Sequence, residues 1–161
     1  MKKKILAGAA VASLAGLVWW NAAGFSSFTI INIGNLHSQI LPFETLTAEG
    51  GESERQGGLM YMRSAMKGLQ TKYPDNLVVS PGDMVMGLWW RLFGGEAEAR
   101  AAAMLGVDVG AVGNHEFSLG LDYFKEALAA HQDFPVLATN LDIEASGFSG
   151  LLSENAVLNT P

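Results

Sequence analysis

The chain has 161 residues, which is about the length of one domain. Apolar residues make up 49% of it and charged residues 16%, so it carries enough apolar surface to fold and is unlike a disordered chain. The formal net charge of −6 argues against nucleic acid as a partner, and the absence of cysteine excludes disulfides and cysteine-ligated metal sites. Any metal ion must therefore be held by His, Asp, Glu or Asn.

Residues 1–23 have the pattern of a bacterial export signal. Three lysines precede an apolar run over residues 5–20, which is shorter than the about 20 residues that a membrane-spanning helix needs. Ala22 and Ala23 offer a cleavage point, although Asn21 fits the usual small-residue rule poorly. We expect a cleaved secretory signal and an exported protein, either periplasmic or extracellular. An uncleaved form, tethered to the membrane by this segment, is the alternative.

The remainder, residues 24–161, alternates short β-rich runs with helical patterns. The expected strands are 28–33, 77–80, 109–112 and 136–139, and the expected helices are 58–72, 96–105 and a third that begins at about Leu121. This β-α-β-α-β-α-β order predicts an α/β fold with a parallel sheet. Residues 42–57 are acidic and Gly-rich, which predicts a long loop before the first helix, and residues 142–161 show no clear period.

Three polar clusters follow the ends of the first three predicted strands. They contain Asn35 and His37, then Asp83, then Asn114 and His115. The loops at the carboxyl ends of parallel strands converge, so these side chains are expected to form one site. Mixed nitrogen and oxygen donors suit divalent Mn, Fe, Co, Ni or Zn, and a carboxylate such as Asp83 can bridge two ions. The pattern predicts a site for two divalent metal ions.

Each cluster is also compatible with a role in the fold alone. A Gly-Asp pair after a strand is commonly only a turn, and the first cluster equally fits a loop whose imidazole bonds to backbone. The run from Asn114 to Glu116 fits such a role less well, because three polar groups after a buried strand need partners or solvent. His131 is expected to be a favourable charge at a helix end, and Trp89-Trp90 is expected in a core or interface.

Several runs resemble the 5'-nucleotidase branch of the calcineurin-like metallophosphoesterases. They are Phe-Thr-Ile-Ile-Asn-Ile-Gly-Asn-Leu-His-Ser from residue 28, Pro-Gly-Asp-Met-Val-Met-Gly from residue 81, and Val-Gly-Asn-His-Glu-Phe-Ser from residue 112. The similarity extends to about residue 142. It implies an exported hydrolase that cleaves phosphate esters of nucleotides with two metal ions. For the fold, it implies the N-terminal half, over residues 24–161, of a metallophosphoesterase α/β/β/α sandwich, apparently truncated.

The resemblance also implies roles for individual residues. His37 would bind the first metal ion, Asp83 would bridge both ions, and Asn114 would bind the second. Asn35 stands at a ligand position where the family has Asp, which removes one negative charge from the metal site. His115 would stabilise the transition state or protonate the leaving oxygen.

Further departures from the family limit the expected activity. Ser118 replaces an Asp that pairs with the catalytic His in the family, and the family's later metal-binding histidines and nucleoside-binding domain are not found before Pro161. We therefore expect weakened metal binding and negligible turnover by this chain. The alternatives are a non-catalytic exported remnant, a half-domain that binds a complementing chain at the open sheet edge, and one product of a split gene.

Overall fold

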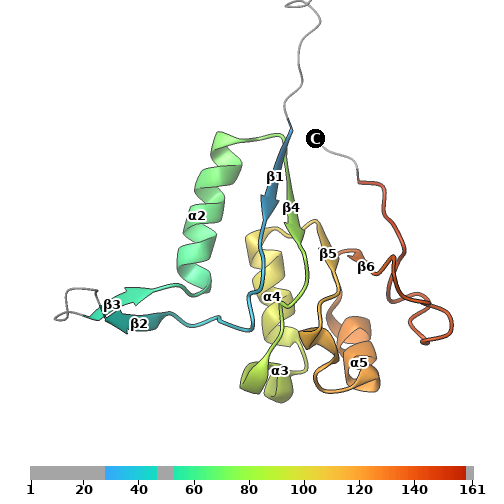
Figure 1. Cartoon of the computed structure of the whole chain (residues 1–161). Helices are drawn as coiled ribbons and strands as arrows, with labels where there is room; N and C mark the ends of the chain where they lie inside the picture. The colour runs from blue at the N-terminus through green and yellow to red at the C-terminus, as the bar shows by residue number, and fades with distance from the viewer. Residues whose placement is uncertain (1–27, 47–52, 159–161) are drawn as a thin grey trace, which may run out of the picture.

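The structure, a computed structural model, describes residues 28–46 and 53–158 (Figure 1). The predicted export signal, residues 1–23, lies outside the described residues. In chain order the elements are β1 (Thr29–Asn32), β2 (Phe43–Leu46), β3 (Ser53–Gln56), α2 (Leu59–Lys72), β4 (Asn76–Ser80), α3 (Gly87–Phe93), α4 (Glu96–Leu105), β5 (Val109–Ala111), the 3-10 helix η1 (His115–Phe117), α5 (Leu121–His131) and β6 (Val136–Leu137). None of the helices in the described ranges is long and apolar enough to cross a membrane.

Strands β1, β4, β5 and β6 form one parallel sheet in that spatial order (Figure 1). The register pairs Ile31 with Val78 and Gly110 with Val136. Helical crossovers connect consecutive strands, so all four carboxyl ends lie at the same edge of the sheet. The predicted α/β class and parallel sheet are confirmed, and each predicted strand is present with bounds that differ by at most two residues.

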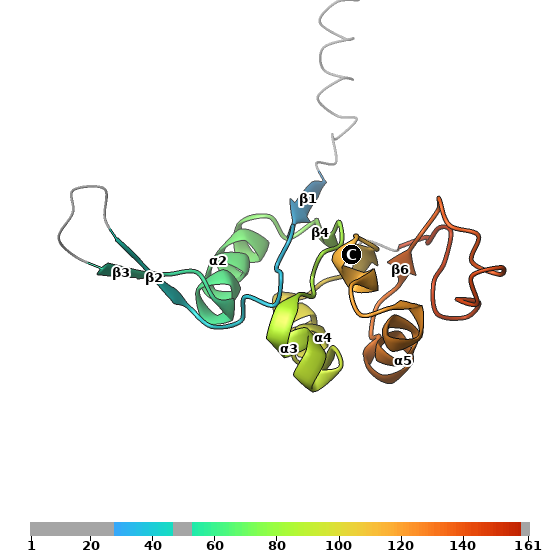
Figure 2. The ribbon, with the colours of Figure 1, turned by 60° about the horizontal axis from the view of Figure 1, so that its bottom comes forward.

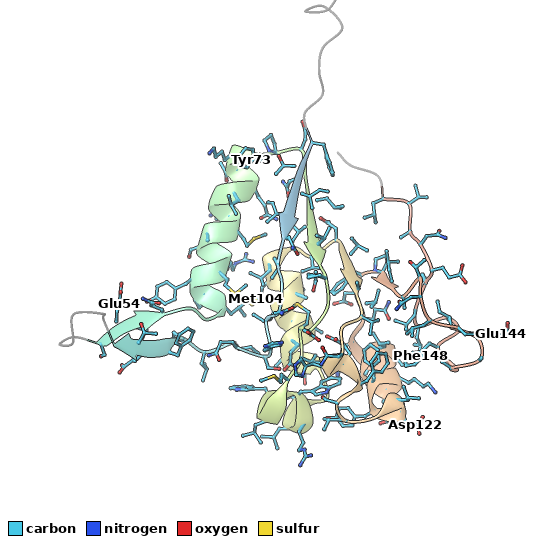
Figure 3. The ribbon with its side chains drawn as sticks, in the orientation of Figure 1. Glu54, Tyr73, Met104, Asp122, Glu144 and Phe148 are labelled. Atoms are coloured by element: carbon cyan, nitrogen blue, oxygen red, sulfur yellow. The ribbon has the colours of Figure 1, made fainter. Side chains whose placement is uncertain are left out.

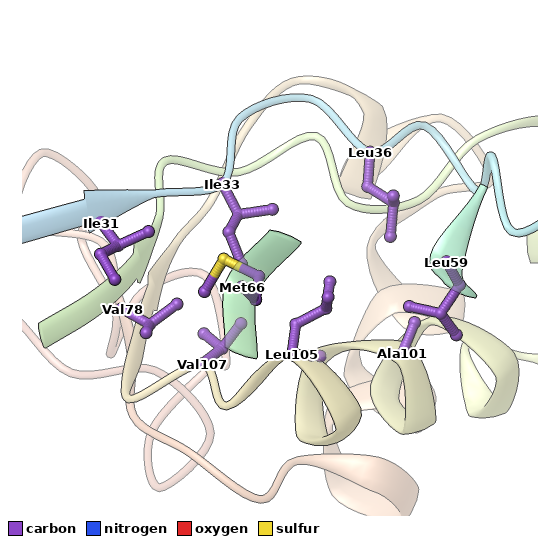
Figure 4. Packing of buried hydrophobic residues seen from close by; sticks show 10 residues of the cluster. Ile31, Ile33, Leu36, Leu59, Met66, Val78, Ala101, Leu105 and Val107 are labelled. Atoms are coloured by element: carbon purple, nitrogen blue, oxygen red, sulfur yellow. The ribbon is translucent and has the colours of Figure 1, made fainter. Parts of the chain in front are cut away.

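Helices α2 to α5 all pack on one face of the sheet, as the two core clusters show. Ile31 and Val78 lie in one cluster with side chains of α2 and α4 (Figure 4). Val136 lies in the second, with Trp90 of α3 and Phe124 of α5. Figure 2 shows α3, α4 and α5 on the same side of the strands. Burial of these two clusters supplies the main apolar contribution to stability.

The opposite face of the sheet is also apolar. The strand register places Ile30, Leu77, Val79 and Leu137 on it. Ile30 is 61% exposed, and the other three are partly exposed. Parallel sheets are usually apolar on both faces because both are covered by other elements. Here α2 to α5 occupy only the other face, and none of them covers Ile30.

The prediction of a long loop over residues 42–57 is wrong. Phe43–Leu46 and Ser53–Gln56 pair antiparallel as β2 and β3, and the hairpin projects from the sheet (Figure 1). Every residue of β3 is exposed, so this strand lacks the alternation of apolar and polar residues by which a half-buried strand is identified. Phe43 lies against Gly57, where an added Cβ would come 2.6 Å from the ring.

Helix α3 is present in the structure but is not predicted from the sequence. It has 7 residues, too few for a helical period to stand out in the sequence. Trp90 anchors it, being 1% exposed and in edge contact with the Tyr123 ring at 5.0 Å between centroids. The Tyr123 hydroxyl also donates to the Trp90 carbonyl at 2.8 Å. Trp89 stacks instead on Phe93, with centroids 5.3 Å apart, so only the second tryptophan of the pair is a core residue.

The segment after β6, for which the sequence shows no period, packs back onto α5 and β6. Phe148, which is labelled in Figure 3, contacts Phe124 of α5 with ring centroids 5.5 Å apart. Ser153 donates its N–H to the Val136 carbonyl and accepts from the Ala138 N–H. These bonds extend the sheet beyond β6 without a regular strand.

Candidate metal centre

Three loops meet at the carboxyl edge of the sheet. They follow β1, β4 and β5 and carry the three polar clusters that the sequence places there. The first two loops bond directly through backbone, because His37 N–H donates to the Asp83 carbonyl and Ser38 N–H donates to the Met84 carbonyl. The convergence expected from a parallel sheet is therefore present.

His37, Asp83 and His115 form a group with one nitrogen or carboxylate oxygen from each residue, and these three atoms lie within 4.8 Å of one another. His37 Nε2 is 3.9 Å from Asp83 Oδ2, and the two imidazole rings meet edge to face with centroids 4.7 Å apart. Asp83 Oδ1 is engaged differently, since it accepts the His115 N–H at 2.9 Å. One carboxylate thus faces two imidazoles from two other loops.

The two predicted asparagine ligands lie beside this group in sequence and are exposed. Asn35 precedes His37 by two residues, with a positive φ of 49°. Asn114 directly precedes His115 at the start of η1, where its carbonyl accepts the Phe117 N–H. The structure thus places all five predicted residues on the three loops and groups three of them, and their roles as ligands stay predictions.

Backbone strain is concentrated at this site. Among the described residues, the non-glycine residues with positive φ are Asn35, His37, Ser38 and Asp83, at 48° to 55°. Such left-handed conformations are costly for residues with a Cβ and persist only where surrounding contacts hold them. All of these except Ser38 are predicted ligands on chemical grounds. The strain gives an independent reason to treat these loops as functional.

Two glycines allow the second and third loops to approach each other. A Cβ on Gly82 would collide with the backbone of Gly113, and a Cβ on Gly113 would collide with the Asp83 carboxylate. Gly82 also has a φ of +106°. Each loop therefore needs glycine where the chains pass, because no other residue leaves room for the neighbouring backbone and carboxylate.

Glu116 is a part of the site for which the sequence pattern indicates no particular role. Its carboxylate is buried, at 6% exposure, and accepts three backbone N–H groups from the second and third loops. The donors are those of Asp83, Met84 and Gly113, at 2.8 to 3.1 Å. The sequence shows that the polar residues from Asn114 to Glu116 need hydrogen-bond partners. It does not show which partners they have, because two of the three donors to Glu116 lie about 30 residues away in the loop after β4.

A second buried carboxylate supports the first loop. Glu98 of α4 is 2% exposed and accepts the hydroxyl hydrogen of Ser38. The Ser38 oxygen in turn accepts the Met86 N–H at 2.8 Å, which joins the first and second loops. Sequence reasoning missed Glu98, since in an Ala-rich helix a glutamate is ordinarily a solvent-exposed residue.

A hollow of about 380 Å³ opens beside His115. Its lining includes Met86, Leu88, Arg91, His115 and Ser118, which combine apolar surface with a cation and a hydroxyl. Ser118 and His115 thus border the same hollow. His131, the remaining histidine, lies in the last turn of α5 as expected, and lines a separate cavity of about 100 Å³.

The grouped residues fit a divalent metal ion. His37 Nε2 is buried and has no hydrogen-bond partner within the described residues, so its ring nitrogen is open to a ligand. Two donors that each lie about 2.1 Å from one ion are at most about 4.2 Å apart, and the His37–Asp83 separation of 3.9 Å is within that limit. It is too long for a hydrogen bond. Two imidazoles and a carboxylate are donors suited to Zn, Mn, Fe, Co or Ni.

Comparison with curated proteins finds relatives over most of the chain. The snake venom 5'-nucleotidase of Gloydius brevicauda is 28% identical over 158 residues, which cover 91% of this chain and 26% of that protein. A probable 5'-nucleotidase of Treponema pallidum is 34% identical over 140 residues, covering 84% of this chain and 23% of that protein. The chain therefore spans about a quarter of the length of the curated relatives it matches. No protein-family profile matches the chain.

Solved structures agree with these relatives. A 5'-nucleotidase precursor from Thermus thermophilus superimposes with a TM-score of 0.73 at 24% identity, over 83% of this chain and 26% of that one. The calcineurin-like phosphoesterase YfkN from Bacillus subtilis gives a TM-score of 0.54 at 20% identity, over 68% and 36%. The chain therefore has a fold similar to part of the fold of these two proteins. The chain itself is a relative of the 5'-nucleotidases and resembles an N-terminal part of them.

Proposed function

We propose that this chain forms part of a phosphoric monoester hydrolase of the 5'-nucleotidase type, with a nucleotide or a related phosphate ester as substrate. The grouping of His37, Asp83 and His115 at the sheet edge carries the proposal. The relatives named 5'-nucleotidase support the substrate class. Divalent metal ions at this site would neutralise phosphate charge and make a water molecule a better nucleophile.

Each of the five predicted site residues has a separate role in the proposed reaction. His37 would bind the first ion through its open Nε2, and Asp83, whose carboxylate lies near that nitrogen, would be the ligand shared by the two ions. Asn114 would contribute an amide oxygen to the second ion, and Asn35 would contribute one to the first. His115 holds a proton for the leaving oxygen, and the hollow beside it gives the leaving group room.

The charge of the site predicts weak metal binding and slow turnover. The grouped side chains contain one carboxylate and two imidazoles, and a neutral amide at position 35 adds no charge. Fewer negative ligands hold a dication less firmly. Ser118 beside His115 also lacks the carboxylate that would orient the imidazole. We expect the chain to bind Mn²⁺ and to release phosphate slowly or not at all.

The test is calorimetric titration with Mn²⁺, compared among the parent chain, His37→Ala and His131→Ala. His131 is the matched control because it is a histidine on α5 that is not among the proposed ligands. We expect His37→Ala to weaken binding at least about tenfold, since it removes a proposed ligand of the first ion, and His131→Ala to leave it unchanged. Equal affinity in His37→Ala and parent would contradict the proposed metal site.

Phosphate release from a nucleoside monophosphate is measured in the same proteins. Steady hydrolysis that is lost in His115→Ala would support the class of reaction and contradict the expectation of negligible turnover. Hydrolysis that survives in His115→Ala would contradict the role of that residue.

A second candidate function is that of a half-domain that binds another chain. The observation that favours it is the apolar sheet face around Ile30, together with β1 at the end of the strand order. A chain that pairs with β1 and covers this face would bury apolar surface and satisfy edge backbone groups. Size-exclusion chromatography with light scattering, with and without a periplasmic extract, tests it. A well-folded monomer that takes up no partner would contradict it.

We also propose that residues 1–23 direct export. The similarity to a venom 5'-nucleotidase supports a secreted setting. Cell fractionation followed by N-terminal sequencing of the mature protein distinguishes cleavage near Ala23 from an uncleaved, membrane-tethered form.

A further inference from the structure

We propose that Glu116 is a positioning residue that holds the Asp83 carboxylate in its place between the two histidines. The inference rests on the proposed function, in which Asp83 is the bridging ligand, and adds a residue that this function does not use. It is carried by the hydrogen bonds of a single buried side chain, together with the strained backbone that they hold.

The Glu116 carboxylate joins two loops. Its Oε2 accepts the N–H of Asp83 at 3.1 Å and that of Gly113 at 2.8 Å, and its Oε1 accepts the N–H of Met84 at 2.9 Å. Bonds to a charged acceptor are stronger than those between neutral groups, and this carboxylate is shielded from water. The backbone of the second loop is therefore fastened to the third.

These bonds act on the conformation of Asp83 itself. The N–H of Asp83 belongs to the peptide plane before its Cα, and the N–H of Met84 belongs to the plane after it. A carboxylate that fixes both planes restrains both φ and ψ of Asp83, which lies at a φ of 55°. A residue with a Cβ leaves that region unless contacts hold it there. The direction of the Asp83 side chain depends on those two angles.

The site also contains a reporter of this positioning to which the Glu116 carboxylate makes no hydrogen bond. The His115 N–H donates to Asp83 Oδ1 at 2.9 Å, so this amide senses where the Asp83 carboxylate lies. The opposite Asp83 oxygen, Oδ2, is the one that faces His37 Nε2. A displaced Asp83 would therefore change the His115 amide and the metal donor set together.

An amide in place of the carboxylate cannot make the same bonds. A glutamine has one acceptor oxygen and one NH₂ group, which can only donate. With its oxygen at the Oε2 position, Glu116→Gln keeps the bonds from Asp83 and Gly113, but its NH₂ then opposes the Met84 N–H. The restraint on the second peptide plane is lost while the volume of the side chain is unchanged.

The experiment compares the full chain with Glu116→Gln and Leu152→Ala. Leu152 is buried in the second core cluster and lies outside the three loops, so its truncation lowers stability without removing the loop hydrogen bonds. The first measurement is hydrogen exchange of the His115 amide by NMR. In Glu116→Gln we expect the His115 amide to exchange about tenfold faster than the change in the global free energy of unfolding accounts for. In Leu152→Ala we expect the exchange rate to change only as much as the global free energy of unfolding predicts. An unchanged His115 amide in Glu116→Gln overturns the proposal.

The second measurement is the affinity for Mn²⁺ of the same three proteins. We expect a loss of about tenfold in Glu116→Gln and none in Leu152→Ala. Equal losses in both variants would show that general stability, and not the position of Asp83, determines affinity, and would overturn the proposal. If the parent chain binds no Mn²⁺ through His37, the proposed function fails, while the His115 amide still decides the role of Glu116.

Discussion

At position 35 this chain has a neutral asparagine, whereas its resemblance to the 5'-nucleotidases implies a negatively charged aspartate ligand. We predict that Asn35→Asp tightens Mn²⁺ binding several-fold, by about 1 kcal/mol, because a carboxylate adds one negative charge to the donors. Aspartate tolerates the positive φ of 49° at this position about as well as asparagine does. Titration calorimetry measures the change, with Asn155→Asp in the exposed tail as the control for net charge. Equal effects of the two substitutions would contradict a local role.

Gly113 lies where the loop after β5 passes close to the loop after β4. A Cβ there collides with the Asp83 carboxylate, so Gly113→Ala should lower the free energy of unfolding by about 1–3 kcal/mol, as overpacking does, and weaken Mn²⁺ binding with it. Gly68→Ala is the matched control, because an added Cβ in the middle of α2 meets nothing within 4 Å. That variant should gain about 0.5–1 kcal/mol from helix propensity. Urea denaturation measures both, and a stable Gly113→Ala would contradict the close approach of the loops.

Helix α3 depends on one of its two adjacent tryptophans. Trp90 is buried against Tyr123, whereas Trp89 is partly exposed and stacks on Phe93. Trp90→Ala should therefore cost about 3–5 kcal/mol of unfolding free energy, the range for deletion of a buried aromatic side chain. Trp89→Ala should cost less than half as much. Denaturation monitored by circular dichroism compares them, and equal losses would contradict the placement of α3.

At the scale of the whole molecule, the exposed apolar face of the sheet should determine how strongly the protein self-associates in solution. We predict that Ile30→Lys reduces self-association and the binding of a hydrophobic dye, because Ile30 is 61% exposed at the centre of β1. Val157→Lys is the matched control, since Val157 is 91% exposed but isolated in the tail. Light scattering and dye fluorescence measure the effect. Equal self-association and equal dye binding in the two variants would contradict a role of the apolar sheet face in association.

Regular elements with a strong local pattern are predictable from this sequence. The α4 helix occupies 96–105 as the Ala-rich run indicates, and α2 begins one residue after the expected start at Gly58. The hairpin and α3 are not predictable in this way. The exposed β3 has no apolar period, and α3 is too short to display one. Their formation depends on pairing and packing with distant residues, such as Tyr123 against Trp90.

The identity of the chemical groups at the sheet edge follows from the amino-acid sequence alone. Buried strands, each followed by a polar cluster, imply parallel strands whose loops converge, and this places His37, Asp83 and His115 together. The way in which that group is held is a property of the folded chain. The partners of Glu116 and the left-handed backbone of Asp83 depend on contacts between loops that lie about 30 residues apart. Local sequence patterns record the period of a strand or helix, and they carry no information about which distant N–H a buried carboxylate accepts.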